Sequence, residues 1–112
     1  MKRSWMLAMA LAVAGGLSAP ANATGTTAWG KITEITGGWT VPMFGVQTAA
    51  PAINPDACQY SAPYIIPPDA PAHDMFVSML MTAYARGDLV ELTVSGCSGW
   101  PIIIGIRVHP AS

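Results

Sequence analysis

The sequence predicts a mainly β domain with one helix: a small five-stranded antiparallel barrel in which the helix lies between strands 3 and 4. Three observations predict this fold class. Five short stretches rich in β-branched or alternating apolar residues are separated by Gly- and Pro-containing turns. One stretch in the second half of the chain has helical periodicity instead. Only one connection is long enough to be a crossover, which disfavours a layered parallel sheet.

The first 23 residues are expected to be a signal peptide rather than part of this domain. Lys2 and Arg3 form a short positive region, residues 5–17 form an apolar run too short to span a bilayer, and Ala21-Asn22-Ala23 is a small-residue cleavage signal. Cleavage after Ala23 leaves residues 24–112 as a single OB-like domain. We therefore expect a secreted or periplasmic protein with no membrane span in the mature chain.

The charge of the exported part restricts its partners. Three basic residues, Lys31, Arg86 and Arg107, stand against six acidic ones, so the formal net charge of residues 24–112 is −3 with neutral histidines. Phosphate contacts need lysine and arginine. We therefore expect no nucleic-acid partner and no polybasic membrane patch.

The first three strands are expected at residues 28–36, 41–48 and 60–66. Ile and Thr dominate the first of them, and Gly37-Gly38 then predicts a turn. Pro42 indicates an edge position or a bulge at the start of the second strand. Residues 24–27 are expected to form a frayed lead-in, and the Pro- and Asn-containing stretch 49–59 predicts a loop.

Residues 71–86 predict one amphipathic helix. Its apolar positions recur with helical spacing and comprise Ala72, Phe76, Met79, Leu80 and Ala83. Asp69 is expected to cap the helix N-terminus, with Pro71 in the first turn. Gly87 is expected to end the helix after Arg86 in a left-handed conformation.

The last two strands are expected at residues 90–95 and 102–108. Val90, Leu92 and Val94 alternate with polar residues, as in a half-buried strand. In the final strand the inward row is expected to comprise Ile102, Ile104, Ile106 and Val108, with Ile103 as an exception on the outer row. If this is an edge strand that pairs with a neighbouring subunit, Ile103 lies in the contact, which indicates a homo-oligomer.

Three strands, a helix and two further strands make the layout of the OB-fold, a five-stranded, partly open barrel. The helix is expected to plug one end of this barrel. Cys58 and Cys97, the only cysteines, lie 39 positions apart in the exported part. In an oxidising compartment this pair predicts one disulfide.

Several segments carry a resemblance to known proteins. They are Gly30-Lys31-Ile32-Thr33, Tyr64 and Ile66 before a Pro-Asp turn, the run 79–90, and Ser95-Gly96-Cys97. Together they resemble a group of small exported bacterial proteins of unknown role. The layout is also similar, more distantly, to the receptor-binding B subunits of pentameric AB-type toxins. That likeness implies a disulfide-containing OB-fold, a five-membered ring and glycan binding, but no toxin sugar-binding residue aligns with this chain.

Catalytic and metal-binding patterns are not found in the sequence. The two histidines, His73 and His109, lie outside recognisable motifs, His73-Asp74 fitting a solvated first helical turn and His109 a C-terminal tail. Two histidines and two oxidised cysteines do not supply a zinc site. We therefore expect no enzyme activity, no cofactor and no metal. A small hydrolase built on His73-Asp74 is the weakest alternative.

Aromatic residues are the remaining candidates for a binding site. Trp39 and Trp100 lie beside glycine turns, where a large ring can stay accessible, whereas Trp29 is expected in the core. OB-folds bind oligosaccharides and oligonucleotides on strands 2 and 3 and neighbouring loops. Here that face includes Phe44, Gln47, Tyr60 and Tyr64, and the predicted ligand contacts are Trp39, Trp100, Tyr60 and Tyr64. The structural alternative is that these rings cap the open end of the barrel.

The sequence thus favours an exported, non-catalytic binding module that recognises glycans or a protein partner. The alternative is a structural or assembly subunit that forms homo-oligomers without a small-molecule ligand. Turn-borne aromatics support the first, and the apolar last strand supports the second.

Overall fold

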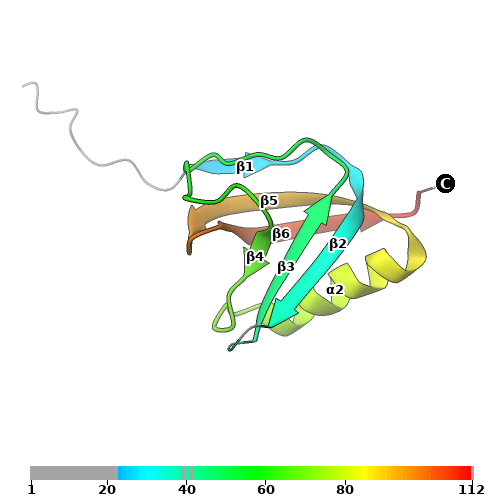
Figure 1. The fold of residues 1–112 in the computed structure, drawn as a ribbon. Helices are drawn as coiled ribbons and strands as arrows, with labels where there is room; N and C mark the ends of the chain where they lie inside the picture. The colour runs from blue at the N-terminus through cyan, green and yellow to red at the C-terminus, as the bar shows by residue number, and fades with distance from the viewer. Residues whose placement is uncertain (1–22, 39, 41, 112) are drawn as a thin grey trace, which may run out of the picture.

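The computed structural model describes residues 23–38, 40 and 42–111 and is mainly β with one helix (Figure 1). The predicted signal peptide, apart from Ala23, lies outside these residues. The elements in chain order are β1 (Thr24–Thr26), β2 (Gly30–Gly38), β3 (Met43–Thr48), β4 (Tyr64–Ile66), α2 (His73–Arg86), β5 (Leu89–Cys97) and β6 (Pro101–His109). The helix lies between β4 and β5, as the sequence predicts.

The strands form one mixed sheet that closes partly into a ring. Their order is β1-β5-β2-β3-β4-β6, and a further pairing between β5 and β6 brings the ends together. β4 runs parallel to β6 through the pair Ile65 and Ile102, while the other described pairings are antiparallel. The expected five-stranded, wholly antiparallel sheet is therefore wrong in strand number and in this pairing. The parallel pair is possible because α2 and β5 lie between β4 and β6 in the chain and form the crossover.

The additional strand is β1, which the sequence predicts only as a frayed lead-in. Thr24, Gly25 and Thr26 pair with Ser95, Val94 and Thr93 of β5. The Thr26 and Thr93 hydroxyls lie 3.1 Å apart, and the Thr27 N–H donates to the Leu92 carbonyl at 2.8 Å. The segment is ordered because β5 offers it a free strand edge that is remote in sequence.

Strand boundaries differ from the prediction mainly at the turns. Gly37 and Gly38 were expected in a turn, but they continue β2 and pair with Phe44 and Met43. β4 is only three residues long, whereas the prediction began at residue 60. The chain before β4 forms no strand and is held by contacts with other parts of the molecule. Strand propensity is a local property and does not predict such contacts.

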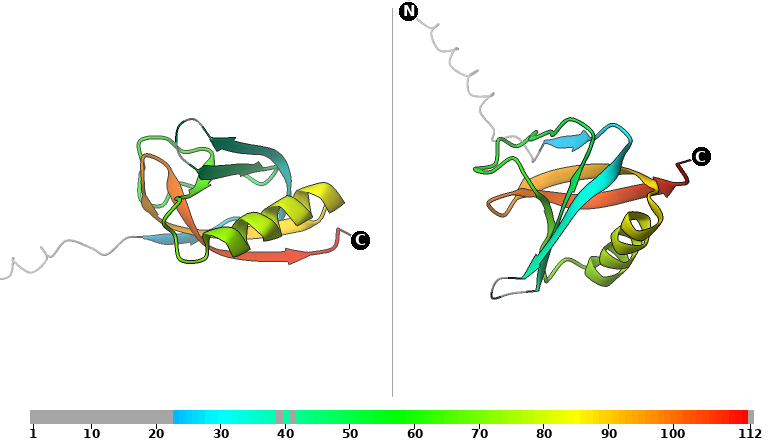
Figure 2. Two further views of the ribbon diagram at one scale, coloured as in Figure 1. Left: turned by 90° about the horizontal axis from the view of Figure 1, so that it is seen from below. Right: turned by 45° about the vertical axis from the view of Figure 1, so that its right-hand side comes forward.

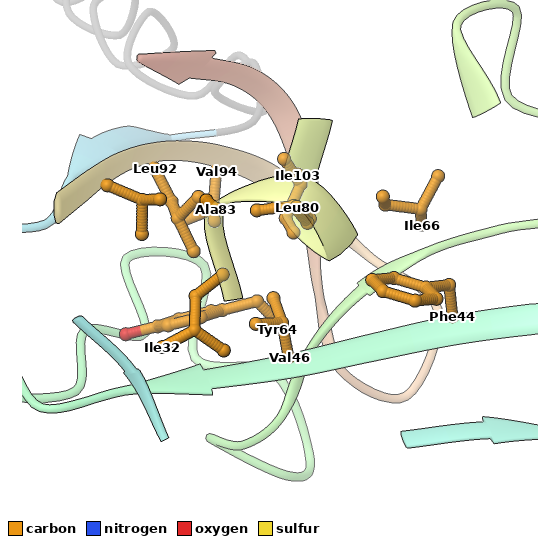
Figure 3. Packing of buried hydrophobic residues seen from close by; sticks show 11 residues of the cluster. Ile32, Phe44, Val46, Tyr64, Ile66, Leu80, Ala83, Leu92, Val94 and Ile103 are labelled. Carbon is orange, nitrogen blue, oxygen red and sulfur yellow. The ribbon is translucent and has the colours of Figure 1, made fainter. Parts of the chain in front are cut away.

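A single apolar core fills the space between the strands and the helix (Figure 3). β5 contributes Val90, Leu92 and Val94, all fully buried, in the predicted alternation. Leu80 and Ala83 from α2 are buried in the same cluster, as the helical stripe predicts. The cluster also contains Ile32, Phe44, Val46, Tyr64, Ile66 and Ile103.

The helix lies between the β2–β3 hairpin and β6 (Figure 2). It begins at His73 rather than residue 71, and its N-cap is Ala72 with no side-chain cap hydrogen bond, so the predicted Asp69 cap is wrong. Asp69 lies instead in a turn in which the Ala70 N–H donates to the Pro67 carbonyl at 3.1 Å. This turn, followed by a second one from Ala70 to His73, separates the carboxylate from the helix.

The end of the helix agrees with the prediction. Gly87 has φ 72°, a left-handed conformation that a residue with a Cβ adopts at a cost. The N–H groups of Gly87 and Asp88 donate to the carbonyls of Tyr84 and Ala83 at 3.3 and 3.0 Å. These bonds satisfy the last turn and direct the chain into β5.

β6 contains a β-bulge that reverses the expected orientation of two isoleucines. Val94 pairs with Ile103 and Thr93 with Gly105, which leaves Ile104 as an extra residue. Ile103 is therefore buried, with 2% of its surface exposed, and Ile104 is 52% exposed. The prediction of Ile103 on the outer row and Ile104 on the inner row is wrong because strict alternation does not hold across a bulge.

Leu80 and Met81 provide a test of the helix orientation. Leu80→Ala is expected to lower the free energy of unfolding by about 3 kcal/mol because it leaves a cavity in the core. Met81 is 54% exposed, so Met81→Ala is expected to change that value by less than about 0.5 kcal/mol. Urea denaturation of both variants measures the difference. Equal losses would contradict the observed helix orientation.

Candidate functional site

Two aromatic rings from distant parts of the chain stack on the surface. Tyr60 lies in the loop between β3 and β4, and Trp100 lies in the turn between β5 and β6. Their ring centroids are 5.1 Å apart with planes inclined by 26°, a stacked arrangement. Tyr60 is 47% exposed and Trp100 is partly exposed, so the pair presents aromatic surface to solvent.

The covalent bridge predicted from the sequence joins the two segments that carry these rings. Cys58 and Cys97 form a disulfide with their Cα atoms 5.6 Å apart. Cys58 is two residues before Tyr60, and Cys97 is three before Trp100. The Tyr60 N–H also donates to the Gly99 carbonyl at 2.9 Å. The bridge and this hydrogen bond fix the two rings relative to each other.

Polar contacts hold the same loop from the other side. The Asp56 carboxylate accepts hydrogen bonds from the backbone N–H groups of Gly96 and Ala23, both at 2.6 Å. The Asn54 side chain accepts from the Cys58 N–H at 2.8 Å and donates to the Cys58 carbonyl at 3.0 Å. The Gly96 bond joins the loop to β5 beside the disulfide, whereas the Ala23 bond comes from the residue just before the expected mature chain.

A small pocket of about 90 Å³ adjoins the rings and shares Trp100 as part of its wall. The end of β2, the start of β3, and β4 with the residue before it supply its other described lining residues, which are Thr36, Gly37, Gly38, Met43, Gly45, Pro63 and Ile65. A Cβ at Gly45 would lie 3.0 Å from the Pro63 side chain, so glycine is what allows Pro63 to cover β3. None of these lining residues is charged.

The remaining predicted contacts lie elsewhere. Tyr64 is 3% exposed and forms part of the core, and its hydroxyl accepts a hydrogen bond from the Ile53 N–H at 2.9 Å. Phe44 is likewise buried, and the Gln47 amide donates to the Glu34 carboxylate at 3.1 Å. Trp39 lies outside the described residues. The structure therefore brings Tyr60 and Trp100 together, and it places Tyr64 inside the molecule.

Trp29 and His109 form a second aromatic contact. Their ring centroids are 4.3 Å apart, and the Arg107 guanidinium carbon lies 5.8 Å from the Trp29 ring centroid. Trp29 is partly exposed rather than in the core, and His109 is the last residue of β6 rather than part of a tail. Strand pairing of His109 with Leu89 explains its position.

Both ring nitrogens of His73 are in contact with oxygens. Its Nδ1 lies 3.0 Å from a carboxylate oxygen of the exposed Asp74, and its Nε2 lies 3.2 Å from the Pro42 carbonyl. These contacts tie the helix N-terminus to the β2–β3 turn. Within the described residues, no three or more His, Cys, Asp or Glu side chains gather where a metal ion could be held.

Asp56, Gly45 and Pro63 are site residues that the sequence did not reveal. Asn-Pro-Asp indicates a turn at residues 54–56, but it does not show that the carboxylate reaches Gly96, which is 40 positions away. No local signal identifies Gly45 as the place where Pro63 packs.

The chain matches no protein-family model, no curated protein and no solved structure. The resemblance to small exported bacterial proteins and to toxin B subunits therefore stays a prediction. In the part of the chain that the structure describes, no helix has the length and apolar character needed to cross a bilayer.

The disulfide is expected to contribute substantially to stability. Replacing both cysteines with alanine is expected to lower the free energy of unfolding by about 4 kcal/mol, because the bridge closes a 39-residue loop in the unfolded chain. Urea denaturation measures the loss, and the wild-type protein under reducing conditions should show a similar one. An unchanged midpoint in both would contradict this prediction.

Asp56→Ala is expected to lower the free energy of unfolding by about 2 kcal/mol, because the Gly96 N–H loses a charged acceptor. Asp69→Ala is the matched control, since Asp69 is exposed in the turn before the helix and its loss is expected to change stability by less than about 0.5 kcal/mol. Thermal and urea denaturation at neutral pH measure both. A loss no larger than that of the control would mean that Asp56 does not anchor the loop.

Proposed function

We propose that this protein is an exported, non-catalytic binding module that recognises a neutral glycan through the Tyr60–Trp100 stack and the adjoining pocket. The observation that carries the proposal is a partly exposed aromatic pair, fixed by a disulfide and a backbone hydrogen bond, beside an uncharged pocket. Rigid aromatic rings are effective recognition anchors because they lose little conformational entropy on binding.

The proposal includes the assignment of the fold as an OB-like barrel. The ring of β2, β3, β4, β6 and β5, with β1 as an added edge strand, supports this assignment. OB-folds bind oligosaccharides on their second and third strands and on the loops after the first and fourth strands. In this chain those positions correspond to β3, β4, the β2–β3 turn and the β5–β6 turn, which includes Trp100.

Export is the second component of the proposal. The basic and apolar N-terminal segment followed by Ala21-Asn22-Ala23 supports a cleaved leader. The Cys58–Cys97 disulfide supports an oxidising compartment, secreted or periplasmic, because such bridges are rare in the cytosol.

The size and polarity of the pocket favour a glycan over a protein partner. A cavity of about 90 Å³ is smaller than the clefts of about 300–1,000 Å³ that enclose whole small ligands. It therefore has room for only one group that protrudes from a larger ligand. The stacked rings offer an apolar face to the C–H side of a sugar. The Gln59 amide, which donates to the Tyr60 hydroxyl at 3.2 Å, offers a hydrogen bond beside the rings. The Thr36 hydroxyl, which lines the pocket and donates to the Glu34 carboxylate at 3.3 Å, can accept one. A protein partner commonly buries about 800 Å² on each side and does not need this pocket.

A glycan array probed with purified protein tests the proposal. We expect binding to a restricted set of neutral glycans, reduced at least about tenfold by Trp100→Ala or Tyr60→Ala, which corresponds to about 1.4 kcal/mol. Trp39→Ala tests the third predicted ring in the same assay. Tyr84→Ala is the matched control, because Tyr84 is 49% exposed on the helix, away from the stack.

Two results would contradict the proposal. One is no binding to any glycan on the array by folded, oxidised protein. The other is binding that survives both Trp100→Ala and Tyr60→Ala, or that Tyr84→Ala weakens equally.

A further inference from the structure

One edge of β6 is almost free of strand pairing. β6 pairs with β5 from Pro101 to His109, but its other edge meets β4 at a single position, Ile102 opposite Ile65. β4 ends at Ile66, and the chain then turns away toward the helix. Among the described residues no strand pairs with this edge of β6 beyond Ile102. An edge of this kind presents unpaired N–H and C=O groups that another strand can use.

The open edge borders an apolar groove between β6 and α2. A cavity of about 450 Å³ lies at the start of the strand, where Phe76, Pro67 and Ile104 contribute to its walls. A second cavity of about 280 Å³ lies near its end, between Met79, Ala83 and Val108. The two cavities offer room for apolar side chains at the start of β6 and near its end.

Ile104 adds an exposed apolar side chain to the same edge. The bulge opposite Thr93 and Val94 turns it outward, and 52% of its surface is accessible. Natural edge strands are commonly protected by charges, particularly lysine, or by proline. After Pro101, the only charged side chain of β6 is Arg107, in its second half.

We propose that β6 pairs with β6 of a second copy of this chain to form a two-fold symmetric, antiparallel dimer. Such an interface is self-complementary, because each copy supplies the edge that the other lacks. The apolar side chains of each β6 then enter the groove of the other copy. This surface is separate from the Tyr60–Trp100 stack, so the inference does not depend on the glycan proposal.

Charge favours the antiparallel arrangement. Asp69 lines the groove at the start of β6, and Asp74 is fully exposed nearby on the helix. Arg107 lies toward the other end of β6, with 75% of its side chain exposed and its Nη1 3.2 Å from Glu91. Antiparallel pairing brings Arg107, with Glu91 beside it, toward the acidic end of the other copy, whereas parallel pairing places the two acidic ends together.

The oligomeric state of protein expressed from the full-length sequence tests the proposal. Sedimentation equilibrium from micromolar to millimolar concentration should show a monomer–dimer equilibrium. Ile104→Lys should weaken the dimer at least about tenfold, or about 1.4 kcal/mol, because it places a charge on the pairing edge. Met81→Lys is the matched control, since Met81 is similarly exposed on the helix but lines neither cavity.

A charge exchange tests the direction of pairing. Asp69→Lys should weaken the dimer, and Asp69→Lys combined with Arg107→Asp should restore it. A combined variant as weak as the single one would overturn the antiparallel arrangement. A monomer at every concentration, a higher oligomer, or a dimer that withstands Ile104→Lys would overturn the β6 interface. Circular dichroism of each variant verifies that the fold is intact.

Discussion

The covalent bond between Cys58 and Cys97 is the constraint on which both the fold and the proposed site depend. Residues 49–63, between β3 and β4, form a long connection without helix or strand. Connections longer than about 12–15 residues without secondary structure are uncommon in compact domains. Here the bridge ties that connection to the end of β5, and the Asp56 and Asn54 side chains complete the attachment. A domain of this size has little core with which to order such a loop by packing alone.

The same loop connects the core to the aromatic surface. Ile53 packs against the core and donates its N–H to the buried hydroxyl of Tyr64, while Tyr60 stacks outside on Trp100. Tyr60 therefore lies on a segment that is fixed at its start, at its middle and at the disulfide, and this segment holds it against Trp100. A ligand that binds them does not have to order the loop, and this preorganisation favours affinity.

The sequence predicted the structure correctly where the spacing of apolar residues indicates which side is buried, and where the presence of two cysteines indicates a disulfide. The spacing of Leu80 and Ala83 and the alternation of Val90, Leu92 and Val94 indicate which side faces the core, and the two cysteines have only each other as partners. It failed where the outcome depends on distant groups. β1 forms because β5 has a free edge, Ile103 turns inward because of a bulge, and Asp69 is displaced from the helix by backbone turns at Pro67 and Ala70. The sequence predicts Tyr60 and Tyr64 in one strand with the same side-chain orientation, and only the three-dimensional arrangement makes one a surface ring and the other a core residue.

The two proposals have a joint geometric consequence. Trp100 directly precedes β6, so an antiparallel pair of β6 strands carries the two Tyr60–Trp100 stacks at opposite ends. β6 contains nine residues, and at about 3.3 Å per residue the stacks would lie on the order of 30 Å apart. A dimer of this kind engages two copies of a ligand on one surface or polymer. Because the second contact is then intramolecular, weak recognition by each small pocket becomes much stronger overall whenever the spacing of the ligands matches that of the stacks.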